Sequence, residues 1–322
     1  LITLFNQFLY VQARIAMLDT FMMTFLIWSF YFLAKSWSPI LKTQQIKKYW
    51  IWSAVLMGLA AGCKWFAIMP WAFIVLIILL FKIFQNWGVH FTKQDKDFDW
   101  YTEELWVEVR LHEILLIWGM LPFAVYFVTF LPLLLLDHPD YSLFNLLTHQ
   151  FEMWKGQKRV PPLHPYSSTW DQWFIPTRAI WYAFDKEGSA QEWVRGVFLL
   201  GNPLVMWFGL ASLFVCLYDW IKNRTRSAFF ILAFYLVFTL SWILIPRPVS
   251  FYYYYYPSAM MLSLALGYAF FRNESKKSFN PFAPWGFLGL VFLVFTYFYP
   301  VLSALKIPSE WFTYWMWLPG WI

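Results

Sequence analysis

Residues 164–182 read HPYSSTWDQWFIPTRAIWY, a polar and aromatic stretch inside an otherwise apolar chain. Prolines at positions 161, 162, 165 and 176 exclude a single regular helix here. Its imidazole, hydroxyl, indole, carboxylate and guanidinium groups are suited to binding a sugar or a phosphate. The alternative is an amphipathic segment at the membrane surface, where Trp and Tyr gather. In either case the stretch separates the apolar runs before it from those after it.

The composition around this stretch is that of a membrane protein. Of 322 residues, 61% are hydrophobic and only 13% are charged, which leaves too little polar surface for a soluble globule. We therefore predict an all-α polytopic membrane protein. Cys63 and Cys216 have no disulfide-framework or metal-ligand spacing, so the sequence suggests neither a disulfide framework nor a metal site. No cofactor is expected. The net charge of +6 lies mostly in short links, which indicates membrane orientation and not nucleic-acid binding.

Apolar runs on both sides of the stretch predict the membrane spans. Four follow it, at about 203–220, 228–245, 252–271 and 284–302, and those before it lie at 20–34, 50–61, 65–84 and 114–136. A turn near Lys64 separates two of these spans. Residues 1–12 are interpreted as the end of a helix whose beginning is missing, and an amphipathic surface helix is expected near Tyr101 to Leu111.

Basic links predict the orientation of this single transmembrane domain, residues 1–322. Cations at 222, 224, 226, 272, 276 and 277 alternate with a nearly uncharged link that carries Arg247. By the positive-inside rule the basic links and the charged loop 85–113 face the cytoplasm. The 137–201 loop, Arg247 and the 303–322 tail then lie together on the opposite face.

Three cations are expected on that outer face, and each has a plain alternative. Arg14 either serves a site with Asp19, snorkels to the interface or forms a local pair with Asp19. Lys64 is either functional or an interfacial anchor. Arg247 lies between two prolines ahead of Tyr252 to Tyr256. Five consecutive tyrosines cannot all face one site on a helix, and an aromatic belt explains them equally well.

The candidate groups in the opening stretch also have alternatives. His164 is a proton carrier or hydrogen-bond donor to a substrate, or it caps the loop. Asp171 and Arg178 are seven residues apart, which makes an orienting pair a weak hypothesis. No convincing external pair of carboxylates is present for acid-base glycosyl chemistry, because the other acidic residues of this loop look like ordinary surface charge. The catalytic base is therefore unknown.

At this point the motifs resemble those of the bacterial protein O-mannosyltransferases, polytopic enzymes of the GT-C class. Arg14-Ile-Ala-Met-Leu-Asp19 resembles the family's Arg-x-x-x-Leu-Asp, and residues 164–173 resemble its external His-Pro-Tyr-Ser-Ser-x-Trp-x-x-Trp loop. Gly201-Asn-Pro203 and the tail from 298 to 322 resemble its closing elements. The resemblance implies a GT-C helix bundle with an external loop of short helices. It also implies a multi-pass protein of the bacterial inner membrane with its active face away from the cytoplasm.

The resemblance further implies transfer of mannose from a polyprenyl-phosphate-mannose donor to Ser or Thr of secreted or membrane proteins, with inversion and without a metal. An Asp-Glu pair in a first external loop, expected upstream of residue 1, supplies the base, so the chain is expected to be N-terminally truncated. Membrane lipids and the secretion translocon are expected partners. The candidate phosphate ligands are Arg14, Lys64 and Arg247. The candidate sugar or acceptor residues are His164, Tyr166, Trp170, Trp173 and Arg178, with Asp19 and Tyr252 in support.

Three other functions remain open on the sequence. A related GT-C transferase would keep the donor but use a lipid or glycan acceptor. A transporter would be expected to show paired broken spans or an inverted repeat, and the sequence shows neither. A non-catalytic membrane scaffold would not need three cations and a polar aromatic loop on one face.

Overall fold

The computed structural model describes residues 1–88, 101, 104–136, 142–158, 164–245, 247–274 and 280–321. The chain forms two compact units, one made of Leu1–Met17 with Val160–Ile322 and the other of Leu18–Arg159. Within the described residues, five helical stretches are long and apolar enough to cross a membrane: Trp65–Asn86, Leu111–Leu135, Pro203–Asn223, Arg226–Leu244 and Phe282–Leu302. The prediction of a helical, polytopic membrane protein is confirmed.

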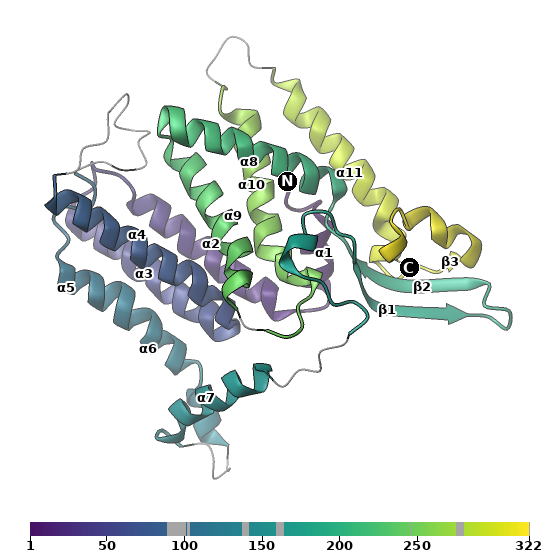
Figure 1. Ribbon diagram of the computed structural model, residues 1–322, viewed down its shortest axis with the longest axis horizontal. Helices are drawn as coiled ribbons and strands as arrows, with labels where there is room; N and C mark the ends of the chain where they lie inside the picture. The colour runs from purple at the N-terminus through teal and green to yellow at the C-terminus, as the bar shows by residue number, and fades with distance from the viewer. Residues whose placement is uncertain are drawn as a thin grey trace. The chain divides into compact units, whose positions relative to one another are not determined.

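The Leu18–Arg159 unit is a helical bundle (Figure 1). Its helices are α2 (Leu18–Ser36), α3 (Thr43–Cys63), α4 (Ile68–Asn86), α5 (Leu111–Ile114), α6 (Leu121–Val128) and α7 (Asn145–Lys158). Helices α2 and α3 approach closely because small serines meet between them. Ser29 Oγ donates to the Ser53 carbonyl at 2.8 Å and Ser53 Oγ donates to the Ser29 carbonyl at 2.7 Å. Such bonds stabilise helix pairs where no water can satisfy a hydroxyl.

The predicted turn near Lys64 is confirmed. Helix α3 ends at Cys63, Lys64 takes an extended conformation with φ −158° and ψ 129°, and a 3₁₀ turn at Trp65–Ala67 leads into α4. The extended backbone lets one apolar stretch form two separate helices. It also places the Lys64 ammonium at a helix end.

The helix predicted near Tyr101 to Leu111 is wrong for the residues described there. Residues 104–108 form turns, and the next helix begins at Leu111. Trp106 explains the difference, because it is 2% exposed with a left-handed φ of 59°, and its indole N–H donates to the Ser36 carbonyl at 2.8 Å. Burial of this indole under the bundle overrides the helical pattern of the segment.

The other unit begins with a short helix and contains four long helices and the chain's described strands (Figure 1). Its elements are α1 (Gln7–Arg14), β1 (Ile180–Glu187), β2 (Trp193–Leu199), α8 (Pro203–Asn223), α9 (Arg226–Leu244), α10 (Tyr256–Phe271), α11 (Phe282–Leu302) and β3 (Ile307–Pro308). Helices α8, α9 and α10 pack against one another. Asn202 precedes α8 and donates to the carbonyls of Phe5 and Val291, which ties α8 to the α1 region and to α11.

A β-hairpin is the main departure from the predicted loop of short helices at 137–201. This segment does contain α7 and a 3₁₀ turn at Trp170–Gln172, but β1 and β2 then pair antiparallel, and β3 adds a third strand in the order β1-β2-β3. Aromatic and β-branched residues make up four of the eight residues of β1 and four of the seven of β2, and Gly188 supplies a φ of 96° at the turn. The sequence signal for these strands lies directly after the polar motif of the loop, at residues 180–199.

Candidate functional site

The 164–182 stretch is joined to the segment that carries Arg247. Ser168 N–H donates to the Ser250 carbonyl at 2.9 Å, and Ser250 Oγ donates to the Ser168 carbonyl at 2.7 Å. An isolated antiparallel bridge pairs Ser167 with Phe251. The 164–182 stretch precedes α8 and the Arg247 segment follows α9, yet the two lie together in one unit.

Arg247 is held against an aromatic stack at this junction. Its Cζ lies 5.0 Å from the centre of the Tyr254 ring, and Tyr254 in turn stacks on Trp242 with centroids 4.5 Å apart and planes at 16°. The Nε of Arg247 is buried and has no hydrogen-bond partner among the described residues. A guanidinium supported on one side by a ring, with a donor left unused, is suited to an anionic ligand.

His164 is exposed and shapes the start of the loop. Its Nδ1 accepts a hydrogen bond from the Tyr166 N–H at 3.2 Å, and its ring meets Phe251 edge to face at 5.0 Å. The capping alternative for His164 is thus realised. Its contact with Phe251 also places the imidazole beside the segment that leads from Arg247 to the tyrosines.

The two tryptophans of the loop differ in burial. Trp173 is 1% exposed, and its indole N–H donates to Ser168 Oγ at 3.0 Å, so it fastens the loop to its core. Trp170 is half-buried and meets Phe174 edge to face. The accessible ring of the pair is therefore Trp170. Exposed Arg178 donates from Nη1 to the Pro165 carbonyl at 3.2 Å and closes the loop end to end.

Four of the five consecutive tyrosines, all but Tyr253, are buried. Tyr252 is fully buried and packs on Phe8, with ring centroids 4.8 Å apart. Tyr253 is the half-buried member, and it stacks on Phe251 at 5.5 Å. Tyr253 is closer to what a substrate would reach than Tyr252. The sequence offered no signal that separates the five.

Arg14 belongs to the same unit as this loop. It is exposed and donates to the Tyr10 hydroxyl at 3.0 Å. Two residues before it, Gln12 accepts a hydrogen bond from the Tyr182 hydroxyl at 3.3 Å. Helix α1, which carries Arg14, is thus bonded to the end of the 164–182 stretch.

Lys64 and Asp19 lie in the other unit and pair with each other. The Lys64 ammonium lies 2.7 and 2.8 Å from the two carboxylate oxygens of Asp19, which is 2% exposed. The predicted partner of Asp19 in a local pair is Arg14, but Asp19 pairs with Lys64, which is far away in the sequence, and Arg14 donates to Tyr10. The assignment of Arg14, Lys64 and Arg247 to one phosphate stays a prediction.

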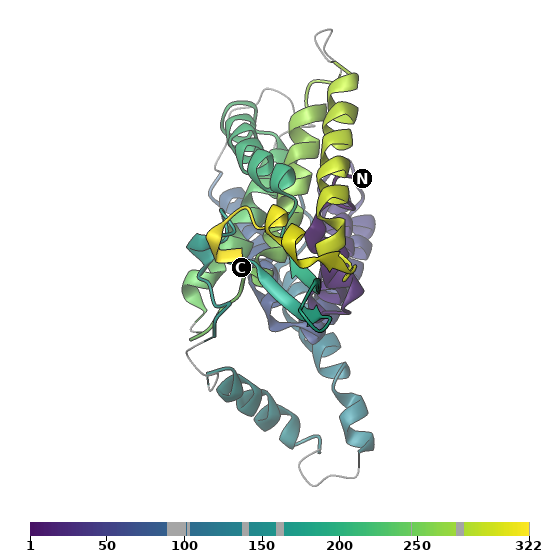
Figure 2. The ribbon, with the colours of Figure 1, turned by 90° about the vertical axis from the view of Figure 1, so that its right-hand side faces the viewer.

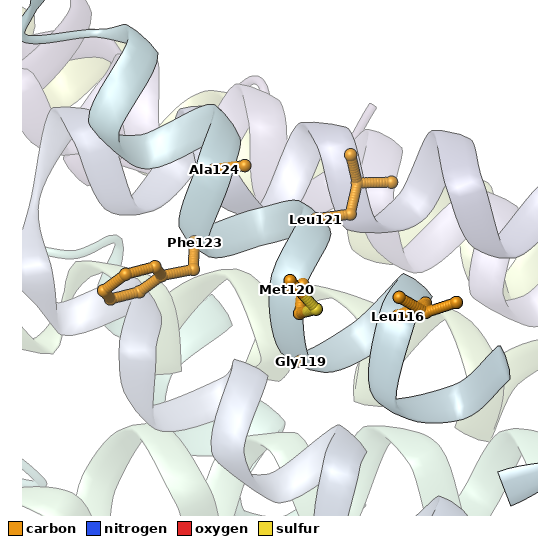
Figure 3. Close-up of a pocket in the computed structure, with 6 residues that line it drawn as sticks. All are labelled: Leu116, Gly119, Met120, Leu121, Phe123 and Ala124. Atoms are coloured by element: carbon orange, nitrogen blue, oxygen red, sulfur yellow. The ribbon is translucent and has the colours of Figure 1, made fainter. Parts of the chain in front are cut away.

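An apolar hollow in the Leu18–Arg159 unit offers no chemistry. Its lining residues all come from the Leu111–Leu135 span: Leu116, Gly119, Met120, Leu121, Phe123 and Ala124 (Figure 3). None of these side chains is polar. The candidate site is therefore the junction of the 164–182 stretch with Arg247 and its aromatic neighbours.

Fold and site together define a multi-pass membrane protein whose candidate site combines a half-buried arginine with half-buried aromatic side chains of a loop. The family model described as "C-terminal four TMM region of protein-O-mannosyltransferase" matches residues 142–321, more than half of the chain. The chain belongs to the protein O-mannosyltransferase family, and it is accordingly a glycosyltransferase.

Curated relatives agree with this assignment. A polyprenol-phosphate-mannose-protein mannosyltransferase of Mycolicibacterium smegmatis (strain MKD8) is 22% identical, over 97% of this chain and 69% of the relative. A protein of the same name from Mycobacterium tuberculosis (strain CDC 1551 / Oshkosh) is 23% identical, over 97% of this chain and 68% of the relative. The similarity thus extends over almost the whole chain, beyond the region that the family model matches.

Proposed function

We propose that the protein transfers mannose from a polyprenyl-phosphate-mannose donor to Ser or Thr hydroxyls of exported proteins, with inversion and without a metal. Family membership and the names of the relatives support the donor and the protein acceptor. The reaction would take place at the outer face of a bacterial inner membrane. The observation that carries the donor assignment is the half-buried guanidinium of Arg247, which lies on the Tyr254 ring next to the 164–182 stretch.

The chemistry needs a cation where negative charge develops. A mannosyl phosphate is already activated, because the departing phosphate is a stabilised anion. A guanidinium held in a half-buried site stabilises that anion more than the same group in water, since the effective dielectric is lower. In this proposal Arg247 binds the donor phosphate, while His164 and Trp170 line the sugar or acceptor side.

The test is transfer of labelled mannose to a Ser/Thr-rich peptide by membranes that contain the protein. Arg247→Ala is expected to lower kcat by about 100-fold, the usual effect of losing one donor to developing charge. Arg195→Ala is the matched control, because Arg195 is exposed on β2 and pairs with Glu187 at 3.5 Å. Transfer is expected to persist in a chelator, and the product linkage is expected to be inverted relative to the donor.

Equal transfer by Arg247→Ala and Arg195→Ala would remove the phosphate assignment. Label on lipid or glycan but not on peptide, from intact inserted protein, would favour a transferase with a different acceptor. Loss of transfer in the chelator would contradict the metal-independent reaction.

A further inference from the structure

The last described segment of the chain lies against residues 164–178, here called the candidate loop (Figure 2). Residues 309–321, here called the closing tail, follow β3 and end in the sequence Leu318-Pro-Gly-Trp321. Trp321 is 2% exposed, and its indole N–H donates to the Pro176 carbonyl at 2.5 Å. In return, the Trp181 indole N–H donates to the Trp321 carbonyl at 2.8 Å. Two reciprocal bonds thus join the tail to the backbone and side chains around residues 176–181.

Gly320 lets the tail come this close. A Cβ built on Gly320 would lie 2.1 Å from the Thr177 carbonyl oxygen, a distance that backbone atoms cannot tolerate. The glycine is required here by contact and not by its own backbone angles. Any side chain at position 320 must therefore move the tail away from Thr177 or displace the loop.

The tail is itself fixed to rigid elements. The Trp315 indole N–H donates to the Tyr297 carbonyl of α11 at 2.6 Å, and the Trp321 ring packs on Phe198 of β2 at 5.6 Å. Trp181 packs on Phe198 at 4.5 Å. The tail therefore connects the loop to α11 and to the β1–β2 hairpin.

The contacts with the closing tail lie at the C-terminal end of the loop, at Pro176 and Thr177. Two residues after Pro176, Arg178 closes the loop by donating to the Pro165 carbonyl, next to His164. The strand β1 begins immediately afterwards, at Ile180. A displacement of Pro176 and Thr177 therefore reaches the residues that the proposed function places on the sugar or acceptor side.

We infer that Trp321 and Gly320 are positioning residues, and that the closing tail holds the 164–178 loop in the conformation that binds the acceptor. This inference rests on the proposed function. It assigns to the closing tail a role in acceptor binding, with no contact to the substrate. Removal of the Trp321 bond or of the close approach at Gly320 loosens the loop while Arg247 keeps its place on Tyr254.

The experiment compares Trp321→Phe and Gly320→Ala with two matched controls. Trp71→Phe also removes an indole hydrogen bond to a carbonyl, but one made within the Leu18–Arg159 unit, to the Trp118 carbonyl at 2.7 Å. Gly289→Ala adds a methyl group in α11 where nothing lies within 4 Å of the Cβ position. The readouts are the rate of tryptic cleavage after exposed Arg178 in intact membranes, and KM for acceptor and donor separately.

Both test variants are expected to cleave faster after Arg178 and to raise the acceptor KM by about tenfold, with the donor KM unchanged. Both controls are expected to behave like the unaltered protein. Unchanged cleavage and unchanged acceptor KM in Trp321→Phe would overturn the inference. If Gly320→Ala does not accumulate, Trp321→Phe decides alone, because it keeps an aromatic ring in the same space.

Cleavage does not require transfer, so the two proposals fail separately. An unaltered protein without mannosyl transfer would refute the proposed function, while cleavage would still show whether the tail holds the loop. Faster cleavage in Trp321→Phe with no change in acceptor KM would show a structural contact without a positioning role, which also overturns the inference.

Discussion

The Asp19 carboxylate is almost completely buried, and its charge is balanced by Lys64, the extended residue that follows α3. Lys64 approaches both oxygens of Asp19 within 2.8 Å, while its own side chain stays 23% exposed. A buried pair of this kind gives little net stability when formed, because both ions lose water. Loss of one partner is costly, since the other charge is left buried alone.

Lys64→Met should therefore lower the free energy of unfolding by roughly 3 kcal/mol, the lower end of the usual cost because Lys64 is partly exposed. The measurement is unfolding of the purified protein in detergent. Lys155→Met is the control, since Lys155 pairs with Glu152 at the surface at 2.8 Å and should change stability by about 0–1 kcal/mol. Equal stability of the two variants would show that the buried pair is not needed for folding.

At the scale of elements, close helix packing depends on a few small residues. A Cβ on Gly58 of α3 would lie 2.5 Å from the Pro122 carbonyl and 2.7 Å from Val125 Cβ, both on α6. Glycine weakens a helix, so its presence here has a packing reason. The α3 and α6 backbones meet because nothing larger stands between them.

Gly58→Ala is expected to destabilise the protein by about 1–3 kcal/mol, because overpacking outweighs the gain of about 1 kcal/mol in helix propensity. Gly119→Ala is the matched change in the same unit, at a position with nothing within 4 Å of the Cβ. It should be neutral or slightly stabilising. Detergent unfolding of the two variants checks the opposite signs, and a stable Gly58→Ala protein would mean that α3 and α6 are not in tight contact.

Some elements could be predicted because their causes are local. The break at Lys64 interrupts a long apolar run with polar and small residues, and the structure contains it. The turns at 104–108 could not be predicted in this way. They depend on Trp106 finding the Ser36 carbonyl, a contact between residues far apart in the sequence.

At the scale of the whole molecule, the basic links predict which ends of the spans share a face. Lys222 lies on a basic link, whereas Glu310 lies on the closing tail, and both are exposed. The positive-inside rule places the first in the cytoplasm and the second outside. The candidate loop lies on the side of the tail, because Trp321 bonds Pro176.

Single cysteines test this orientation in a background where Cys63 and Cys216 are replaced. Glu310→Cys should react in intact cells with a maleimide that cannot cross membranes. Lys222→Cys should react only after the cells are opened. Labelling of Lys222→Cys in intact cells, with Glu310→Cys protected, would invert the predicted topology and move the candidate site to the cytoplasm.

The sequence by itself determined that this is a helical membrane protein with a polar, proline-rich loop between its apolar runs, because hydropathy and proline placement act locally. It also identified the family, because the motifs of that loop and of the tail are contiguous in the chain. Only the tertiary structure decided that Asp19 pairs with Lys64, that Tyr252 is buried, and that Trp321 bonds Pro176. These facts depend on which distant residues share a space, and packing alone selects among the partners that a sequence allows.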